Sequence, residues 1–302
     1  MGFKLAHFSD VHLGPLPRGT AFQDFAPKRI IGVLSWVLSR RKRHLPHIAS
    51  ALMTDIEDAH VDHVAFTGDL VNVAAAAEFK QGAEWLKAWA NPDQLSFVPG
   101  NHDAYVPIAY DKSLGLLEAF MSNDMRNTMV ALVEPFPFVR LRRNIALIGL
   151  STAQPQTFSR VGGTVGLTQR EALREKLKVL RERGFYRAVL IHHPPAPGLA
   201  HPFRALSDAA EVAGILKDEG ADLVLHGHNH TETLHWLESP HGPVPVVGVP
   251  SASMTTRSHH PAAAWNCYDI DRAKGKWQTR LSIRQWQGSH FITTKDFELI
   301  KP

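Results

Sequence analysis

Short polar motifs rich in aspartate, asparagine and histidine recur along this chain, and their side chains are those that bind divalent metal ions. Five occur in a fixed order: Asp10-Val11-His12, Gly68-Asp69, Gly100-Asn101-His102-Asp103, His192-His193-Pro194 and Gly227-His228-Asn229-His230. A carboxylate bridges two dications that would otherwise repel, and neutral imidazole and carboxamide groups complete each shell without excess negative charge. The set therefore predicts a site for two divalent metal ions that acts on phosphate esters.

Each motif taken alone has a simpler interpretation. Asp10 would cap a helix, Asp69 and Asn101 would form turns, and the last two histidines would be ordinary loop residues. All five would then have to be coincidences, although they keep one order and follow apolar runs. Motif matches gain weight from such context, which favours the metal site.

Apolar runs typical of buried strands precede the motifs. They cover residues 3–8, 63–67, 95–98, 145–150, 188–191 and 223–225, and helical patterns at 44–58, 76–89 and 169–183 lie between most of them. In the last helix, Thr168 and Glu171 predict a capping box. The alternation is the α/β pattern, in which ligands bind at the carboxyl ends of strands.

After His230 the pattern changes to successive strands at 231–238, 244–249, 263–270 and 276–286. We find nothing that resembles a linker between domains. The expected organisation is one domain over residues 1–302 with two sheets, in which residues 16–44 form a helical cap or flanking insertion.

Composition narrows the function classes. The single cysteine, Cys267, excludes an intramolecular disulfide and a cysteine-based zinc cluster. A net charge of +4 with a pI of about 9.2 suits an anionic substrate, but it is too small for a protein that coats nucleic acid. The first residues run straight into a strand and leave no room for a secretory leader, so we expect a cytoplasmic protein.

The ordered motifs resemble those of the calcineurin-like metallophosphoesterases over residues 7–230. This resemblance implies an α/β fold in which a two-sheet β-sandwich is flanked by helices, in four αββα layers. It also implies the metal ligands: Asp10, His12 and His230 for one ion, Asp69 as the bridge, and Asn101, His192 and His228 for the other. Sequence alone does not choose between His192 and His193. The family's spacing favours His192 and leaves His193 to the pocket.

The resemblance also implies a mechanism. Two ions about 3.5–4 Å apart would clamp the phosphate and activate a hydroxide that attacks phosphorus. His102 would be a general acid or an oxyanion stabiliser, or alternatively a structural hydrogen-bonder. Asp103 would either orient His102 or start a turn. The catalytic candidates are His102, Asp69 and Asp103, and the substrate-binding candidates are Asn101, His102 and His193.

One departure separates branches of this family. The protein phosphatases carry Gly-Asp-x-Val-Asp-Arg-Gly, whereas this chain has Asn72 in place of the second aspartate and lacks the Arg and Gly. Residues 100–103, 192–195 and 265–270 resemble the class III cyclic nucleotide phosphodiesterases and their bacterial relatives. We expect phosphodiester hydrolysis, with 3′,5′-cyclic nucleotides as one hypothesis, and two ions of manganese, iron, zinc or cobalt, manganese being favoured.

Residues 28–44 do not match a common family pattern. An apolar stretch at 28–39 precedes the basic run Arg40-Arg41-Lys42-Arg43-His44. Three interpretations stay open: packing on its own domain or on a second subunit, peripheral contact with the inner face of an anionic membrane, or binding the acyl part of a substrate. The last two would favour a lipid pyrophosphate hydrolase similar to the UDP-diacylglucosamine hydrolases.

Two further alternatives are a DNA exo- or endonuclease and a non-catalytic scaffold. Ser9–Gly14 is shared with DNA-repair nucleases, but no basic stripe interleaved with aromatic residues supports nucleic acid as a partner. A scaffold would predict a broken ligand set, and this set is intact.

Overall fold

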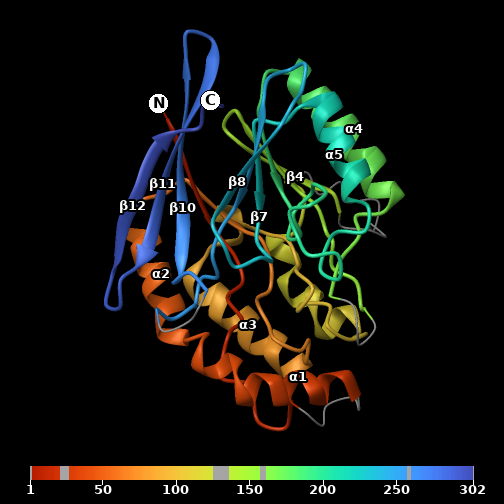
Figure 1. The fold of residues 1–302 in the computed structure, drawn as a ribbon, viewed down its shortest axis with the longest axis vertical. Coiled ribbons are helices and arrows are strands. Elements are labelled where there is room, and N and C mark those ends of the chain that lie inside the picture. The colour runs from red at the N-terminus through yellow and green to blue at the C-terminus, as the bar shows by residue number, and fades with distance from the viewer. Residues whose placement is uncertain (1, 21–26, 125–135, 157–160, 257–259, 302) are drawn as a thin grey trace.

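The computed structural model describes residues 2–20, 27–124, 136–156, 161–256 and 260–301. Two mixed sheets of six strands each pack against one another, and helices flank them (Figure 1). This arrangement confirms the predicted α/β sandwich.

The first sheet joins the start of the chain to its end. Its order is β12 (Phe291–Glu298), β11 (Lys276–Trp286), β10 (Ala264–Ala273), β1 (Phe3–Phe8), β2 (His63–Phe66) and β3 (Leu95–Phe97). β1 pairs in parallel with β2 and antiparallel with β10, in a register that sets Leu5 opposite Tyr268. The middle of this sheet is therefore built from segments about 260 residues apart in the sequence.

The second sheet comes from the middle of the chain. Its order is β4 (Phe138–Arg142), β5 (Ile145–Gly149), β6 (Tyr186–Leu190), β7 (Leu223–His226), β9 (Val244–Gly248) and β8 (Thr233–Leu237). β5, β6, β7 and β9 run in parallel, so their carboxyl ends meet at one edge.

Helices connect the parallel strands, as such connections require. α2 (Pro46–Asp58) joins β1 to β2, α3 (Ala76–Trp89) joins β2 to β3, α4 (Leu167–Glu182) joins β5 to β6, and α5 (Ala209–Glu219) joins β6 to β7. Short 3₁₀ segments lie at η2 (Arg40–Lys42), η3 (Pro92–Gln94), η4 (Tyr110–Lys112) and η5 (Leu114–Phe120).

Two apolar cores hold these layers together. In the first, Phe8 stacks on Phe66 with ring centroids 4.5 Å apart, and leucines of the second sheet join the same cluster. In the second, Leu173 and Leu177 of α4 pack with Val189 of β6. Burying each such side chain stabilises the fold by about 1.5–3 kcal/mol.

The predicted strands and helices lie within three residues of the observed bounds, with two kinds of difference. β4, β12 and α5 were not predicted. The capping box at Thr168 is wrong, because α4 begins after Gly166, which has a φ of 80°. The amides of Val165 and Gly166 instead donate to the Asp208 carboxylate, at 3.0 and 2.9 Å.

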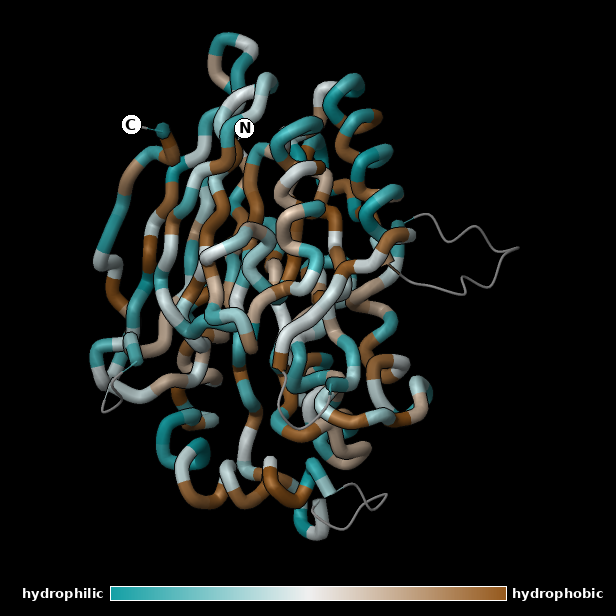
Figure 2. The backbone as a smooth tube through the Cα atoms, turned by 45° about the vertical axis from the view of Figure 1, so that its right-hand side comes forward, coloured by the Kyte–Doolittle hydropathy of each residue, from teal (hydrophilic) through white to brown (hydrophobic). Residues whose placement is uncertain are grey.

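Residues 27–42 form α1 (Pro27–Leu38) and η2 at the foot of the molecule (Figure 1). Inward-facing Arg29 donates to the backbone oxygen of Ala74 at 3.0 Å, which fixes α1 to the domain. The outer side is apolar and exposed: Ile31, Leu34 and Leu38 expose 55%, 55% and 76% of their surface. Figure 2 shows long hydrophobic stretches there. Among the described residues, no helix is both long and apolar enough to traverse a bilayer.

Candidate metal centre

The five polar motifs lie on loops that follow β1, β2, β3, β6 and β7, and backbone hydrogen bonds tie these loops together. The amide of Asp10 donates to Gly68 at 2.9 Å, and that of His12 donates to Asp69 at 2.9 Å. In the second sheet the Gly227 amide donates to the His192 carbonyl at 3.1 Å, and across the sheets the Ala252 amide donates to the Ser9 carbonyl at 2.9 Å. Side chains far apart in the sequence are thereby fixed around one point.

Most of the predicted ligands have a left-handed backbone conformation that L-residues rarely adopt. The φ angles are 57° for Asp10, 46° for His12, 58° for Asp69, 69° for His228 and 54° for His230. Such residues each cost about 1–3 kcal/mol and persist only where the surrounding structure holds them. Their concentration in these motifs marks a functional site.

Glycines precede three of the ligands because there is no room for a side chain. A Cβ on Gly68 would lie 2.6 Å from the Gly100 nitrogen. A Cβ on Gly100 would lie 2.7 Å from both the Asp69 nitrogen and the His192 ring, and one on Gly227 would lie 2.5 Å from Asp10 Oδ2. The loops can approach each other only with glycine at these positions.

One group of ligand atoms surrounds Asp10. Its Oδ1 lies 3.1 Å from His230 Nε2, and that nitrogen lies 3.3 Å from His12 Nε2. His12 Nε2 is also 3.7 Å from Asp69 Oδ2. Two imidazole nitrogens and two carboxylates thus converge on one small volume.

A second group surrounds Asn101. His192 Nδ1 donates to the Thr67 carbonyl at 2.6 Å, because a carbonyl only accepts, so Nε2 presents a lone pair. That lone pair faces Asn101 Oδ1 at 3.2 Å and Asp69 Oδ2 at 3.5 Å, which are also acceptors. Acceptors that face acceptors in a buried site fit a cation between them.

The pKa shifts of the carboxyl and imidazole groups in the site also favour the binding of cations. Burial raises the pKa of Asp69 well above its usual value, and the nearby carboxylates of Asp10 and Asp103 raise it further. Burial lowers the pKa of His12 and His228 well below the usual value, so both are neutral imidazoles, the form that binds metals. His228 Nε2 is buried without a hydrogen-bond partner among the described residues.

The donor set therefore suits two divalent ions. Four sets of side chains bring possible ligand atoms within 4.8 Å of one another: Asp10, Asp69 and His192; His12, Asp69 and His102; His12, His44 and His230; and His192, His193 and His228. Asp69 belongs to two of them, as a bridging carboxylate would.

The geometry favours His192 over His193 as a ligand. His193 Nδ1 contacts Thr152 Oγ1 at 2.7 Å, and its Nε2 lies 3.3 Å from the Val161 carbonyl. Both ring nitrogens of His193 are thus occupied by protein. Val161, but not His193, is among the residues that line the cavity, so the expected substrate contact of His193 stays a prediction.

His102 lies between the metal centre and the backbone of Asn72. Its Nδ1 is 2.5 Å from the Asn72 carbonyl, so Nδ1 carries the proton and donates it. The neutral ring then presents an unprotonated Nε2. Burial and Arg40 lower the pKa of His102 well below its usual value, so a proton taken up at Nε2 would be readily given away. Whether His102 acts as a general acid stays a prediction.

Asp103 holds the backbone around the site. Its carboxylate accepts from the amides of Asp69 at 2.8 Å, Val71 at 3.1 Å and Gly100 at 2.8 Å. Burial raises the pKa of Asp103 to about 7, although these amides oppose the shift. Of the two roles expected for Asp103, the contacts favour the structural one, because they fix the turns that carry Asp69 and Asn101.

Sequence reasoning missed several residues at the centre. His44 packs edge-on against His12, with centroids 4.6 Å apart, and its Nδ1 contacts Ser253 Oγ at 2.9 Å. Arg40, Arg43 and Arg204 also line the cavity. The basic run at 40–44 was the available signal, but nothing in its sequence indicated that two of its arginines and its histidine turn inward.

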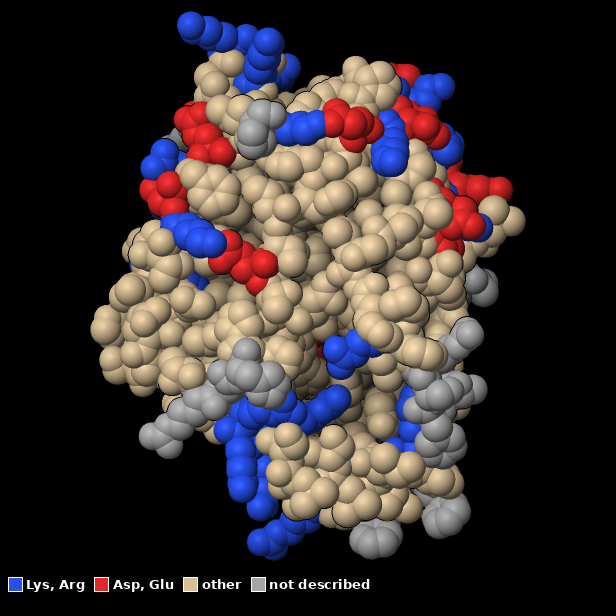
Figure 3. Space-filling view, in the orientation of Figure 1, with Lys and Arg blue, Asp and Glu red and all other residues tan. Residues whose placement is uncertain are grey.

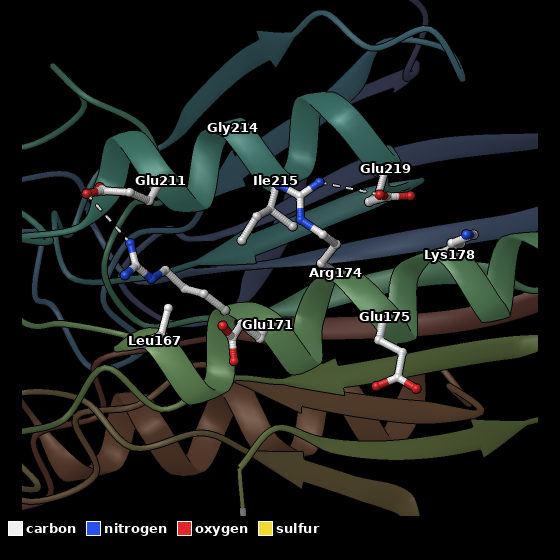
Figure 4. A pocket seen from close by; sticks show the side chains of 10 residues that line it. Leu167, Glu171, Arg174, Glu175, Lys178, Glu211, Gly214, Ile215 and Glu219 are labelled. Carbon is white, nitrogen blue, oxygen red and sulfur yellow. Dashed lines mark hydrogen bonds and ion pairs between the residues drawn. The ribbon is translucent and has the colours of Figure 1, made fainter.

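The cavity over the ligands has a volume of about 130 Å³, enough for a phosphate group but not for a whole substrate. A larger groove of about 730 Å³ lies between α4 and α5, away from the ligands. Its charged residues pair with each other: Figure 4 shows Arg174 reaching Glu219, at 3.4 Å. The small cavity is therefore the candidate site.

Comparisons with known proteins identify the family and the fold. A family model described as calcineurin-like phosphoesterase matches residues 3–232. A dimetal phosphatase from Danio rerio aligns with a TM-score of 0.65 at 13% identity, covering 96% of this chain and 98% of that one. A purple acid phosphatase from yellow lupin seeds aligns with a TM-score of 0.57 at 12% sequence identity, covering 99% of this chain and 53% of that one. No curated protein matches the chain. Identities this low show a shared fold.

Proposed function

The chain belongs to the calcineurin-like phosphoesterase family and is a metal-binding hydrolase of phosphoric esters, and we propose that its substrates are phosphodiesters. The observation that carries this proposal is the set of buried acceptor atoms around Asp69, beneath a cavity of phosphate size. We assign Asp10, His12, Asp69 and His230 to one ion, and Asp69, Asn101, His192 and His228 to the other. Manganese is the first metal to test.

Each side chain has a distinct task in this proposal. Bound divalent ions would supply Lewis-acid activation of the phosphate and of water. Asp10 and Asp69 provide the negative charge that keeps both ions in place, and Asp10 also accepts from the His228 amide at 3.0 Å, which aligns the last loop. His102 would deliver a proton to the leaving oxygen from Nε2, while its Nδ1 stays bound to Asn72.

Support for a diester rather than a phosphoprotein substrate comes from the segment after Asp69. Asn72 donates to the Leu13 carbonyl at 2.9 Å, so it supports the neighbouring loop rather than a substrate. The Arg and Gly that follow in the protein phosphatases are absent from this chain. Among diesters, 3′,5′-cyclic nucleotides are one candidate, on the likeness of residues 100–103 and 192–195 to class III phosphodiesterases.

The test is turnover of a panel by manganese-loaded protein: bis-p-nitrophenyl phosphate, 3′,5′-cyclic AMP, single-stranded DNA and a UDP-linked acyl sugar. p-Nitrophenyl phosphate is the monoester control. We expect diesters to be hydrolysed faster than the monoester, and only with metal. Faster turnover of the monoester would overturn the diester assignment, and hydrolysis of the acyl sugar alone would favour the candidate below.

A second candidate follows from α1. Its exposed apolar side, Ile31, Leu34 and Leu38, lies next to the exposed cations Arg41 and Lys42. An apolar ridge beside positive charge suits the surface of an anionic membrane. On this view the substrate is a phosphoester carried by an amphiphile, and the metal cavity works near the lipid surface.

Vesicle sedimentation separates the two candidates. We expect wild-type protein to pellet with phosphatidylglycerol vesicles but not with phosphatidylcholine vesicles, and Leu34→Glu to stay in solution. A concentration-dependent dimer that Leu34→Glu dissociates would instead identify a second subunit on α1.

A further inference from the structure

Three arginines converge on the rim of the metal cavity from separate parts of the chain. Arg40 lies in η2, Arg43 follows it, and Arg204 comes from the segment after the His192-His193-Pro194 motif. Figure 3 shows Lys and Arg side chains gathered around a hollow in the lower half of the molecule. The positive charge is therefore concentrated beside the ligands.

Among the described residues these arginines form no direct ion pair with a carboxylate, although the charge of Asp69 acts on Arg40. No ion pair joins any of the three to a carboxylate within the described ranges, whereas Arg174, Arg181 and Arg187 all have one. The Nε of Arg43 is buried without a hydrogen-bond acceptor among those residues. An unpaired buried donor of this kind destabilises the protein, so a ligand that accepts from it would be bound favourably.

The contact of Arg40 with His102 does not supply it with an acceptor. Its Nη1 lies 3.1 Å from His102 Nδ1, but that nitrogen already donates to Asn72 and cannot accept a second proton. Burial lowers the pKa of Arg40; the negative charge of Asp69 opposes this shift, and the positive charges of Arg43 and Arg204 add to it, so like charges lie close to Arg40. The rim is thus arranged for an anion that the protein does not supply.

We propose that Arg40, Arg43 and Arg204 form a subsite for a second phosphate of the substrate, next to the phosphate that is cleaved. The inference rests on the proposed function. The cavity of about 130 Å³ admits only the first phosphate, so the next group of the substrate must lie at this rim. Guanidinium groups bind phosphate through paired hydrogen bonds. The preferred substrates are then diesters of diphosphate, and a cyclic nucleotide with one negative charge uses the subsite poorly.

Hydrolysis of a diphosphate diester at this site would consume one water molecule and release two products. The oxygen of water forms a bond to the first phosphorus, and the bond from that phosphorus to the bridging oxygen breaks. The bridging oxygen leaves with the second phosphate, so one diphosphate diester becomes two monoesters, and the protons of water pass to the products or to solvent. The arginines stabilise the charge that develops on the leaving phosphate.

The test uses inorganic pyrophosphate and inorganic phosphate as competitive inhibitors of bis-p-nitrophenyl phosphate hydrolysis, with free Mn²⁺ held constant. The variants are Arg43→Ala and Arg204→Ala. Arg41→Ala is the matched control, because Arg41 belongs to the same basic run but is exposed and does not line the cavity. Thermal unfolding checks that each variant is folded.

We expect wild type and Arg41→Ala to bind pyrophosphate more tightly than phosphate. Each rim variant should weaken pyrophosphate binding about tenfold, the loss of one charged hydrogen bond. Phosphate binding should weaken less than pyrophosphate binding, since a single phosphate would be held chiefly by the metal ions. Equal weakening of both probes, or no weakening of pyrophosphate, would overturn the subsite.

Calorimetric titration distinguishes a failure of the phosphate subsite from a failure of the proposed phosphodiesterase activity. If bis-p-nitrophenyl phosphate is not hydrolysed, the phosphodiesterase proposal fails, yet pyrophosphate binding and its loss in Arg43→Ala remain measurable. If hydrolysis is normal and the calorimetric preference for pyrophosphate is absent, only the subsite fails.

Discussion

Replacing Gly100 by alanine is expected to disable the metal centre while the two sheets stay folded. The new Cβ would lie 2.7 Å from the backbone nitrogen of Asp69 and 2.7 Å from the ring of His192. Ordinary contact begins at 3.4 Å, so each neighbour must retreat by about 0.7 Å. One of these neighbours carries the carboxylate that we propose as the bridge, and the other is a proposed ligand of the second ion.

The expected losses of stability and of activity in Gly100→Ala follow from the size of this displacement. Gly100 does not have a left-handed φ, so the cost of Gly100→Ala is steric rather than conformational. Overpacking of a close contact costs about 1–3 kcal/mol of stability. A misplacement approaching 1 Å at a catalytic site lowers turnover by about 100-fold. We therefore expect a modest loss of stability together with a loss of kcat/KM of at least about 100-fold.

The assay combines three measurements on metal-loaded protein. Metal content by mass spectrometry should fall below that of wild type, and kcat/KM for bis-p-nitrophenyl phosphate should fall by at least about 100-fold. Urea denaturation should detect the modest loss of stability. The matched control is Gly214→Ala in the middle of α5, where a Cβ meets no atom within 4 Å. That variant should gain about 1 kcal/mol from helix propensity and keep its activity.

Normal activity and full metal content in Gly100→Ala would refute the reasoning, because the loops would then accommodate a methyl group for which the structure leaves no space. Loss of activity in Gly214→Ala would also contradict it, by showing that alanine itself is harmful far from the site.

The remaining predictions concern the polar residues. Asp69→Ala should abolish hydrolysis and lower the metal content without unfolding the chain; retention of two ions and of activity would contradict the bridging role. His102→Ala should lower kcat about 10²–10⁴-fold for poor leaving groups, and less for p-nitrophenolate, which leaves without a proton. An equal loss for both would argue against proton donation. Asp103→Asn should cost about 1–3 kcal/mol in urea denaturation even without metal, because the amide cannot accept from every N–H that the carboxylate binds. Unchanged stability would show that those bonds are dispensable.

Much of the fold could be predicted because local and global signals agree. β1, β2 and β7 are short apolar runs buried along most of their length, and each is followed by a ligand motif. β12 was missed because most of its residues are exposed, so it lacks the alternation that marks a half-buried strand. The capping box failed because α4 begins after Gly166, and a distant residue, Asp208, accepts from the amides of Val165 and Gly166 just before the helix.

The candidate site was predictable in its residue types but not in its surroundings. Motif order indicated Asp10, Asp69 and Asn101, since such residues follow strands whose ends converge. The inward turn of Arg40 depends on how α1 is fixed to the loop at Ala74 through Arg29, a contact that leaves no local pattern. Likewise, the hydrogen bonds of His193 to Thr152 and Val161 exist only in the folded chain.

The pairing of β1 with β10 has a consequence for the order in which the protein can become active during synthesis. Asp10 is synthesised 241 residues before Ser251, yet its carbonyl is held by Ser251 Oγ at 2.7 Å, and its carboxylate meets His228 and His230. A nascent chain that ends before residue 228 therefore carries Asp10 without these partners. We expect the metal centre to be complete only after the segment from His228 to Ser251 has folded onto the loop that follows β1.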